Sequence, residues 1–294
     1  MNNCYKSKLA VFVFAAPALV LFTAFLVYPI IPEIIISFQE HDGFQSYGFV
    51  GLSNYISVLT SSSFWKSCIN TLIVVALSLL VALPISLILA LAIDKQTPGV
   101  KNFFKFTSVF PAVMSVTVIS QMWIAIYEPQ WGLLNTILEK IGLGSLTHIW
   151  LTDKSTVMVC IAFAFLWQHV GINCLLFYSG IKSIPTSYYE AAQIDGAGFW
   201  QASWNITIPL LKDVSKYVVT TSTLGSLGMF AYVKAMTAGG PGDASRTVTF
   251  QMYYQAFGTS EFGKGSAVAV LFIIACIIVA FIINKSFGNE RIEY

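Results

Sequence analysis

Long apolar runs dominate the chain, and the residues that interrupt them carry most of its information. Runs of about 20 apolar residues, the length that a helix needs to cross ~30 Å of hydrocarbon, lie near 9–31, 69–93, 106–126, 155–181, 214–236 and 267–284. The pattern predicts an all-α, polytopic membrane protein with six transmembrane helices. The fifth run is the weakest, because Ser, Thr and Gly residues between 220 and 228 dilute it.

Composition agrees with this fold class, with 56% apolar residues, 10% charged residues and a mean hydropathy of +0.73. Lys6 and Lys8 before the first run resemble the start of a signal peptide, but the run is too long for one and lacks a cleavage site. We therefore expect a single transmembrane domain over 1–294, with an N-terminal helix at 9–31 and core helices between 69 and 284.

The distribution of Lys and Arg predicts the orientation. If both termini are cytoplasmic, ten cations lie in cytoplasmic segments and five in outer ones, which is the asymmetry of the positive-inside rule. The cytoplasmic set is Lys6, Lys8, Lys95, Lys101, Lys105, Lys182, Lys212, Lys216, Lys285 and Arg291, and the outer set is Lys66, Lys140, Lys154, Arg246 and Lys264.

Several kinds of chemistry are absent from the sequence. None of the six runs contains Asp or Glu, which ion-coupled carriers commonly use, and no G-x-x-x-x-G-K-[ST] run could bind nucleotide phosphates. The net charge of +2 is scattered, so no nucleic-acid partner is expected. The five cysteines form no CxxC pair and mostly lie inside apolar runs, so we interpret them as packing residues. We expect no catalytic residue, metal or cofactor, and ATP must be bound by a partner.

The segment 184–212 is too apolar for an exposed loop and too interrupted for a membrane span. Ser187 and Glu190 have the spacing of a capping box, Gly196 provides a stop, and Pro209 is expected to end a second helical stretch. We predict a helix-turn-helix hairpin whose small residues admit a partner backbone and whose aromatic residues enter a groove.

Residues 190–192, Gly196 and 206–209 in this hairpin resemble the EAA signature of binding-protein-dependent importer subunits. The stretches FVGLSNY at 49–55, FWKSCINT at 64–71 and MTAGGPGDAS at 236–245 resemble the carbohydrate branch, in particular the maltose-type first membrane subunit. Asn205 departs from the pattern, because a basic residue is common there. The resemblance implies the type I ABC importer permease fold and a cytoplasmic coupling loop at 184–212 that docks on an ATPase. The coupling residues it implies are Tyr189, Glu190, Ala191, Ala192, Asp195, Gly196 and Pro209.

A sugar path needs hydroxyl and amide groups inside the helix bundle. Ser222, Ser226 and Met229 fall on one helix face at i, i+4 and i+7, although Ser and Thr hydroxyls in helices can equally bond their own backbone and permit close packing. The resemblance implies that a substrate path is lined by Gln168, His169, Ile172, Ser222, Ser226 and Met229. We also expect the Gly-Pro-rich loop 237–245 to face an extracytoplasmic binding protein.

The sequence thus predicts the membrane-channel subunit of an ATP-driven importer of a sugar or oligosaccharide, located in the inner membrane in contact with lipid. Its expected partners are a homologous second permease, two ATPase subunits and an extracytoplasmic sugar-binding protein. One alternative is the same machinery importing a non-sugar solute such as a polyol phosphate. A self-sufficient channel or secondary carrier is a further alternative, against which the EAA hairpin argues. A membrane scaffold without transport is another, and it predicts that the polar residues of the fourth and fifth runs face other helices and leave no cavity.

Overall fold

The computed structural model describes residues 8–288, so Lys6 and Arg291 of the predicted cytoplasmic set lie outside the described residues. The described chain is helical apart from loops and one short strand pair. It divides into two compact units, one formed by 1–61 and 251–273 and the other by 62–250 and 274–294.

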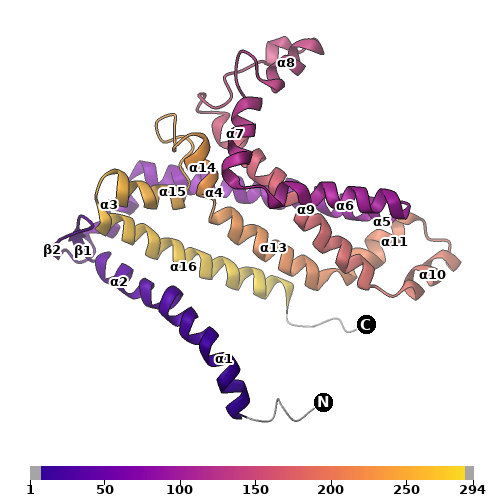
Figure 1. Ribbon diagram of the computed structural model, residues 1–294, viewed down its shortest axis with the longest axis horizontal. Helices are drawn as coiled ribbons and strands as arrows, with labels where there is room; N and C mark the ends of the chain where they lie inside the picture. Colours follow the sequence, from indigo (N-terminus) through magenta and orange to yellow (C-terminus); the bar gives the residue numbers. More distant parts are fainter. Residues whose placement is uncertain (1–7, 289–294) are drawn as a thin grey trace. The chain divides into compact units, whose positions relative to one another are not determined.

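The first unit contains the N-terminal helices, the strand pair and the beginning of the last helix. Strands β1 and β2 are antiparallel, with Gln39 opposite Phe49 and an irregularity after Glu40 (Figure 1). The elements are α1 (Lys8–Phe22), a π-turn (Thr23–Val27), α2 (Tyr28–Ile36), β1 (Gln39–His41), β2 (Ser46–Phe49), α3 (Ser53–Thr60), a second π-turn (Tyr254–Gly258) and α16 (Phe262–Phe287), which continues into the other unit.

Buried polar contacts join the pieces of this unit that are far apart in sequence. The amide of Asn54 donates to the carbonyls of Ser37 at 2.9 Å and Gln39 at 2.8 Å. The hydroxyl of Ser266 donates to the Glu33 carboxylate at 2.6 Å. These bonds satisfy backbone and side-chain groups that would otherwise be costly to bury, and so they fix α3 to the start of the strand pair and the last helix to α2.

The second unit holds the remaining helices around α9. Its elements are α4 (Ser62–Leu77), a π-turn (Ser78–Ala82), α5 (Leu83–Asp94), α6 (Pro98–Val113), α7 (Val116–Ile126), α8 (Leu133–Lys140), a 3-10 turn (Gly144–Leu146), α9 (Val157–Ser183), α10 (Thr186–Ile194), α11 (Phe199–Ala202), a π-turn (Ser203–Thr207), α12 (Ile208–Leu210), α13 (Lys212–Leu227) and α14 (Ala231–Met236), and α15 (Val248–Tyr253) begins in it.

Helix α9 is the centre of this unit, in contact with α4, α5, α6, α7, α13 and α14. The buried Ser86 hydroxyl of α5 donates to its own helix and to the Val170 carbonyl of α9 at 3.0 Å. At Gly171 the α6 backbone comes so close that an added Cβ would lie 1.6 Å from the Ser108 carbonyl oxygen. Small residues at such crossings permit helices to pack through their backbones.

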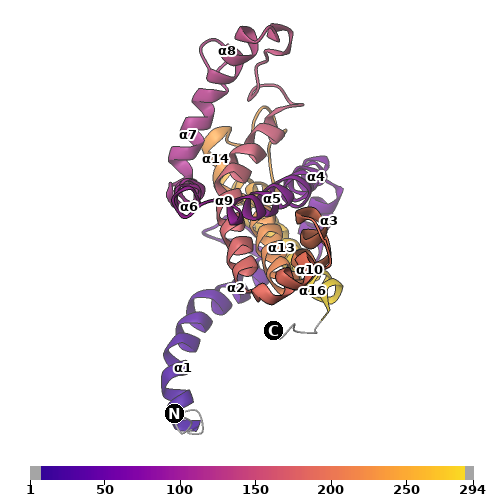
Figure 2. The same cartoon turned by 90° about the vertical axis from the view of Figure 1, so that its right-hand side faces the viewer.

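Within residues 8–288, four helical segments are long and apolar enough to cross a membrane, namely Phe12–Ile36, Ser62–Asp94, Val157–Ser183 and Phe262–Phe287. They correspond to the predicted runs at 9–31, 69–93, 155–181 and 267–284. A fifth span results if α6 and α7, which bend by 99°, are counted as one. Figure 2 shows α6 nearly end-on with α7 turning away from it.

The continuous helices predicted at 106–126 and 214–236 are both wrong in detail, because each is broken. The first breaks at Met114–Ser115, beyond Pro111, where the Ser115 hydroxyl caps α7 by accepting from Val118 N at 3.3 Å. The second breaks between α13 and α14 at 228–230. Glycine is a poor helix former, and Gly228 ends α13 as its C-terminal cap.

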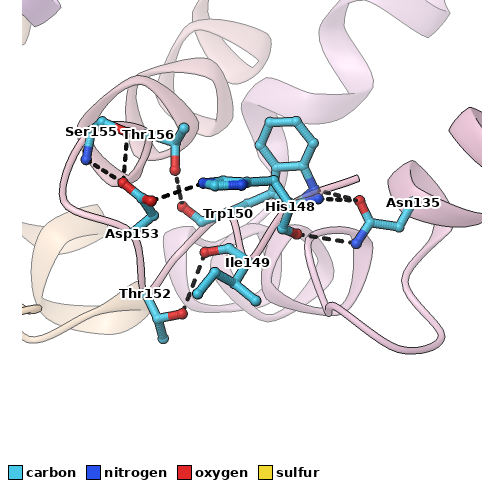
Figure 3. A network of polar contacts seen from close by, with 8 residues as sticks. All are labelled: Asn135, His148, Ile149, Trp150, Thr152, Asp153, Ser155 and Thr156. Carbon is cyan, nitrogen blue, oxygen red and sulfur yellow. Dashed lines mark hydrogen bonds and ion pairs between the residues drawn. The ribbon is translucent and has the colours of Figure 1, made fainter. Parts of the chain in front are cut away.

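The segment 127–156 is held by a polar network around one buried amide (Figure 3). Asn135 Nδ2 donates to the His148 carbonyl at 3.1 Å, and its Oδ1 accepts from Trp150 Nε1 at 2.8 Å. The Asp153 carboxylate accepts from the Ser155 hydroxyl and amide and lies 3.0 Å from His148, and these contacts lower the pKa of Asp153. The network gives a segment with few helical residues a defined conformation.

The crossing at Gly171 provides a test of this packing. We expect Gly171→Ala to lower the free energy of unfolding by at least the roughly 1–3 kcal/mol typical of overpacking, because the methyl group would meet backbone that cannot rotate away. Thermal unfolding of the purified protein in detergent measures the effect. Gly225→Ala is the matched control, since nothing lies within 4 Å of a Cβ built there in α13. Equal melting temperatures for the two variants would contradict the packing described.

Candidate functional site

The predicted helix-turn-helix hairpin is present in the segment 184–212 (Figure 1). Its first helix, α10, begins at Thr186 directly after Pro185, two residues earlier than the capping box with Ser187 as N-cap predicts. Ser187 therefore lies inside the helix, and no side chain caps its start, so the predicted capping box is wrong. Proline needs no N–H partner and its φ is already restricted, which suits the entry to a helix.

The turn at Gly196 agrees with the prediction of a stop. Gly196 has φ +77°, a conformation that favours glycine, and Asp195 is the last residue before it. The amide of Gly196 donates to the Gln193 carbonyl at 3.1 Å, and the amide of Ala197 to the Ala192 carbonyl at 2.8 Å. This pair of bonds is a Schellman motif, which satisfies the last carbonyls of α10.

Pro209 does not end the second helical stretch as predicted. It lies in the first turn of α12, and the stretch that begins at Phe199 continues through it to a turn at Leu211. A proline near the start of a helix costs little stability, because the N–H that it lacks has no helical partner there. The preceding π-turn also changes the register of the backbone hydrogen bonds before Pro209.

The hairpin is tied together internally, is held to the end of α5 by a cation–π contact, and lies beside an ion pair that joins α5 to α9. The hydroxyls of Tyr189 and Thr207 lie 3.0 Å apart and tie its two arms together. Lys95, just after α5, places its ammonium 5.2 Å from the centre of the Phe199 ring. Nearby, Lys182 of α9 forms an ion pair with Asp94 of α5 at 2.5 Å.

Beneath the hairpin is a hollow of about 310 Å³. Ala192 lines it and is buried, whereas Glu190, Ala191, Asp195 and Gly196 are exposed. The exposed side also carries large apolar groups that the sequence analysis did not select, with Ile194 87% exposed, Trp200 61% and Trp204 66%. Several large apolar side chains at such exposure on one hairpin are typical of contact surfaces. Their alternation with polar neighbours could have identified them.

The predicted path residues are drawn from α9, α13 and the break after α13. Gln168 is buried and connects both helix breaks, because its Nε2 donates to the Met114 carbonyl at 2.9 Å and its Oε1 accepts from the Tyr232 hydroxyl of α14. His169 Nδ1 lies 2.8 Å from the Phe165 carbonyl, and its ring stacks on the Phe165 ring.

The serines of α13 point inward. The amide of Asn173 on α9 donates to the Ser222 hydroxyl at 3.1 Å, and the Ser226 hydroxyl bonds back to the Ser222 carbonyl at 2.7 Å. Ser226 and Met229 are buried, whereas Ile172 is 47% exposed. The structure therefore brings Gln168 near the break at 228–230 and joins Ser222 to α9, but it does not place all six residues on one open surface.

The loop 237–247 is fastened to the start of α4. Lys66 forms an ion pair with Asp243 at 2.5 Å, and this ammonium holds the pKa of Asp243 below its ordinary value. The buried amide of Asn70 donates to the carbonyls of Ala244 and Arg246, both at 2.9 Å. Asn70 and Lys66 belong to the stretch FWKSCINT, for which sequence reasoning had assigned no contact.

A family model described as "binding-protein-dependent transport system inner membrane component" matches residues 7–290. The chain belongs to this family. It is 34% identical to the arabinooligosaccharides transport system permease protein of Bacillus subtilis over 98% of this chain and 92% of that one. It is 30% identical to the sn-glycerol-3-phosphate transport system permease protein of Agrobacterium fabrum, over 99% and 98% of the two chains.

The fold also matches a solved structure, a bacterial alginate ABC transporter in complex with an alginate pentasaccharide-bound periplasmic protein. The TM-score is 0.81 at 20% identity, and 94% of this chain and 93% of that one are covered. The chain is accordingly a multi-pass membrane protein and a permease subunit of the ABC transporter class, in the branch of carbohydrate importers, and the ATPase is a separate subunit.

The Gln168 contacts lead to a prediction about the two helix breaks. Gln168→Leu removes the donor to Met114 and the acceptor for Tyr232, and we expect about 1–3 kcal/mol of lost stability for each buried group left unpaired. Thermal unfolding in detergent measures this loss. The exposed Gln96, which bonds only its own helix, supplies the control variant Gln96→Leu. If both variants melted like the wild type, Gln168 would not hold the breaks together.

Proposed function

We propose that this chain forms half of the membrane channel of an ATP-driven importer in the inner membrane. In this proposal it pairs with a homologous second permease, above two ATPase subunits and beneath an extracytoplasmic binding protein. The observation that carries it is the hairpin 184–212, in which a Schellman turn presents exposed apolar side chains on a base fixed to α5 and α9. Such a surface suits a groove of another protein, and the family membership favours the ATPase as that protein.

The proposal includes six transmembrane segments with both termini in the cytoplasm and one permease domain over the whole chain. The broken pairs α6–α7 and α13–α14 supply the third and fifth segments. Non-helical backbone is compatible with membrane depth where protein buries it, and the buried contacts at both breaks support this assignment. The excess of Lys and Arg in the predicted cytoplasmic segments supports the orientation.

A sugar or oligosaccharide is the proposed substrate. The permease from Bacillus subtilis is named for arabinooligosaccharides, and the transporter of similar fold is described with an alginate pentasaccharide. The proposed path residues are Gln168, His169, Ile172, Ser222, Ser226 and Met229, a set of amide, imidazole, hydroxyl and apolar groups without Lys or Arg. A glycerol phosphate, which one relative's name makes the second candidate, would favour a cationic partner.

The coupling role can be tested at Gly196. A side chain there meets open space in the isolated chain, and the left-handed backbone costs an aspartate only about 1–2 kcal/mol, so Gly196→Asp should still fold and place bulk and charge on the docking surface. We expect loss of uptake and at least a tenfold loss of ATPase co-purification, since an unpaired charge in a desolvated contact costs several kcal/mol. Gly142→Asp is the control, because Gly142 has the same left-handed backbone, with φ +81°, and equally open surroundings. Normal uptake by the Gly196 variant would exclude the coupling function.

The orientation can be tested by labelling single cysteines in a chain whose five native cysteines are replaced. Lys140 and Glu190 are exposed and lie in segments assigned to opposite sides. An impermeant thiol reagent applied to intact cells should label Lys140→Cys, and Glu190→Cys should react only after the membrane is opened. The reverse pattern would contradict the proposed topology.

A further inference from the structure

The break between α13 and α14 is closed by side chains from a later part of the chain. At Met229, inside the break, the carbonyl oxygen accepts from the Thr247 hydroxyl at 2.7 Å and from the Thr249 hydroxyl at 3.1 Å. Met229, Thr247 and Thr249 are all buried, at 3%, 0% and 7% exposure. A buried carbonyl without a partner is costly, so these two hydroxyls hold the backbone of the break in its present conformation.

Thr247 is the last residue of the loop 237–247 and Thr249 lies in the first turn of α15, and packing joins the loop to the same break. The Phe250 ring stacks on the Phe230 ring with 6.0 Å between their centres. It also lies against Gly239, where an added Cβ would come within 2.5 Å of it. Gly239 has φ +84°, so a larger residue would be strained there as well. Loop and break therefore form one packed body.

The same body is attached to α4. The amide of Val248, between the two threonines, donates to the Thr71 hydroxyl at 3.0 Å. The Asn70 amide holds two carbonyls of the loop, and Lys66 holds Asp243. Buried hydrogen bonds from Thr247 and Thr249 thus connect this body to the Met229 carbonyl. Ser226, two residues before the break, is fully buried in this conformation.

We propose that Thr247 and Thr249 are positioning residues that transmit the position of the outer loop 237–247 to the helix break beside the substrate path. This inference rests on the proposed function, in which that loop faces the binding protein. The threonines act through the Met229 carbonyl and do not contact the substrate. When a binding protein moves the loop, the hydroxyls move the break and with it the segment that carries Ser226.

The test compares two double variants in the purified complex with its permease, ATPase and binding-protein partners. Thr247→Val with Thr249→Val keeps the shape and removes both hydroxyls, whereas Thr247→Ser with Thr249→Ser keeps the hydroxyls. Basal ATPase activity is measured first. Stimulation is then measured with the binding protein saturated by arabinotriose, maltose or glycerol 3-phosphate, whichever stimulates the wild type most.

We expect the valine pair to lose about tenfold in stimulation, as one unpaired buried carbonyl implies, with basal activity unchanged, and the serine pair to restore it. If the two threonines had a structural role alone, the variants would assemble less well and have lower basal ATPase activity. The serine pair would then behave like the valine pair. If the valine pair fails to assemble, Thr249→Val alone keeps the shorter bond from Thr247 and should show an intermediate loss.

Normal stimulation in an assembled valine variant would overturn the inference and leave the proposed function standing. The same conclusion would follow if the serine pair were as defective as the valine pair. A wild-type complex that no loaded binding protein stimulates would instead remove the proposed function, and this inference with it.

Discussion

Backbone groups that leave a helix within an apolar interior need hydrogen-bond partners, and the arrangement of this permease depends on how that requirement is met at two breaks. At the first break, Gln168 of α9 donates to the Met114 carbonyl. At the second, Thr247 and Thr249 donate to the Met229 carbonyl. Gln168 also accepts from Tyr232 just beyond the second break, so one side chain of the central helix connects both. The helices can be interrupted because other parts of the chain replace the missing helical bonds.

The contacts around α9 explain how such interruptions coexist with a defined fold. Gly171 brings the α6 backbone against α9, and Ser86 ties α5 to it. At the other end of the same helix, the ion pair between Lys182 and Asp94 and the ring of Phe199 under Lys95 fix the base of the hairpin. The long unbroken helix thus connects the proposed coupling segment to the breaks near the proposed path. A motion of the hairpin base would be transmitted to Gln168 by α9 as a rigid element.

Sequence reasoning identified the features that depend on local composition. Apolar runs gave four helices of spanning length, and the glycine at 196 gave the turn, because both follow from short-range preferences. The positions of the breaks were not predicted, although the Ser, Thr and Gly residues between 220 and 228 marked the fifth run as the weakest. What decides between a continuous helix and an interrupted one is the long-range partner, such as Thr247 for Met229, and periodicity contains no information about it.

The candidate site also divides into features that the local sequence predicts and features that it does not. Glu190, Ala191 and Gly196 were assigned from a motif and lie on the exposed side of the hairpin, while Ala192 from the same motif is buried against the chain's own hollow. The direction in which each residue points around the helix decides whether it is exposed or buried, and the motif does not specify that direction. The capping box and the helix-ending role of Pro209 failed because Pro185 and the π-turn at 203–207 shift the helix boundaries by local geometry. Ile194 and Trp200 were not predicted as contact residues because they lie beside the motif and are not part of it.

The most direct test of the central claim is uptake by reconstituted vesicles that contain this permease with its second permease and ATPase. With binding protein outside and ATP inside, the vesicles should accumulate a labelled oligosaccharide above its external concentration. Omission of either ATP or the binding protein should abolish accumulation, because the predicted membrane runs contain no Asp or Glu for ion coupling. Uptake that this chain supports alone, or that an imposed proton or sodium gradient drives without ATP, would contradict the account.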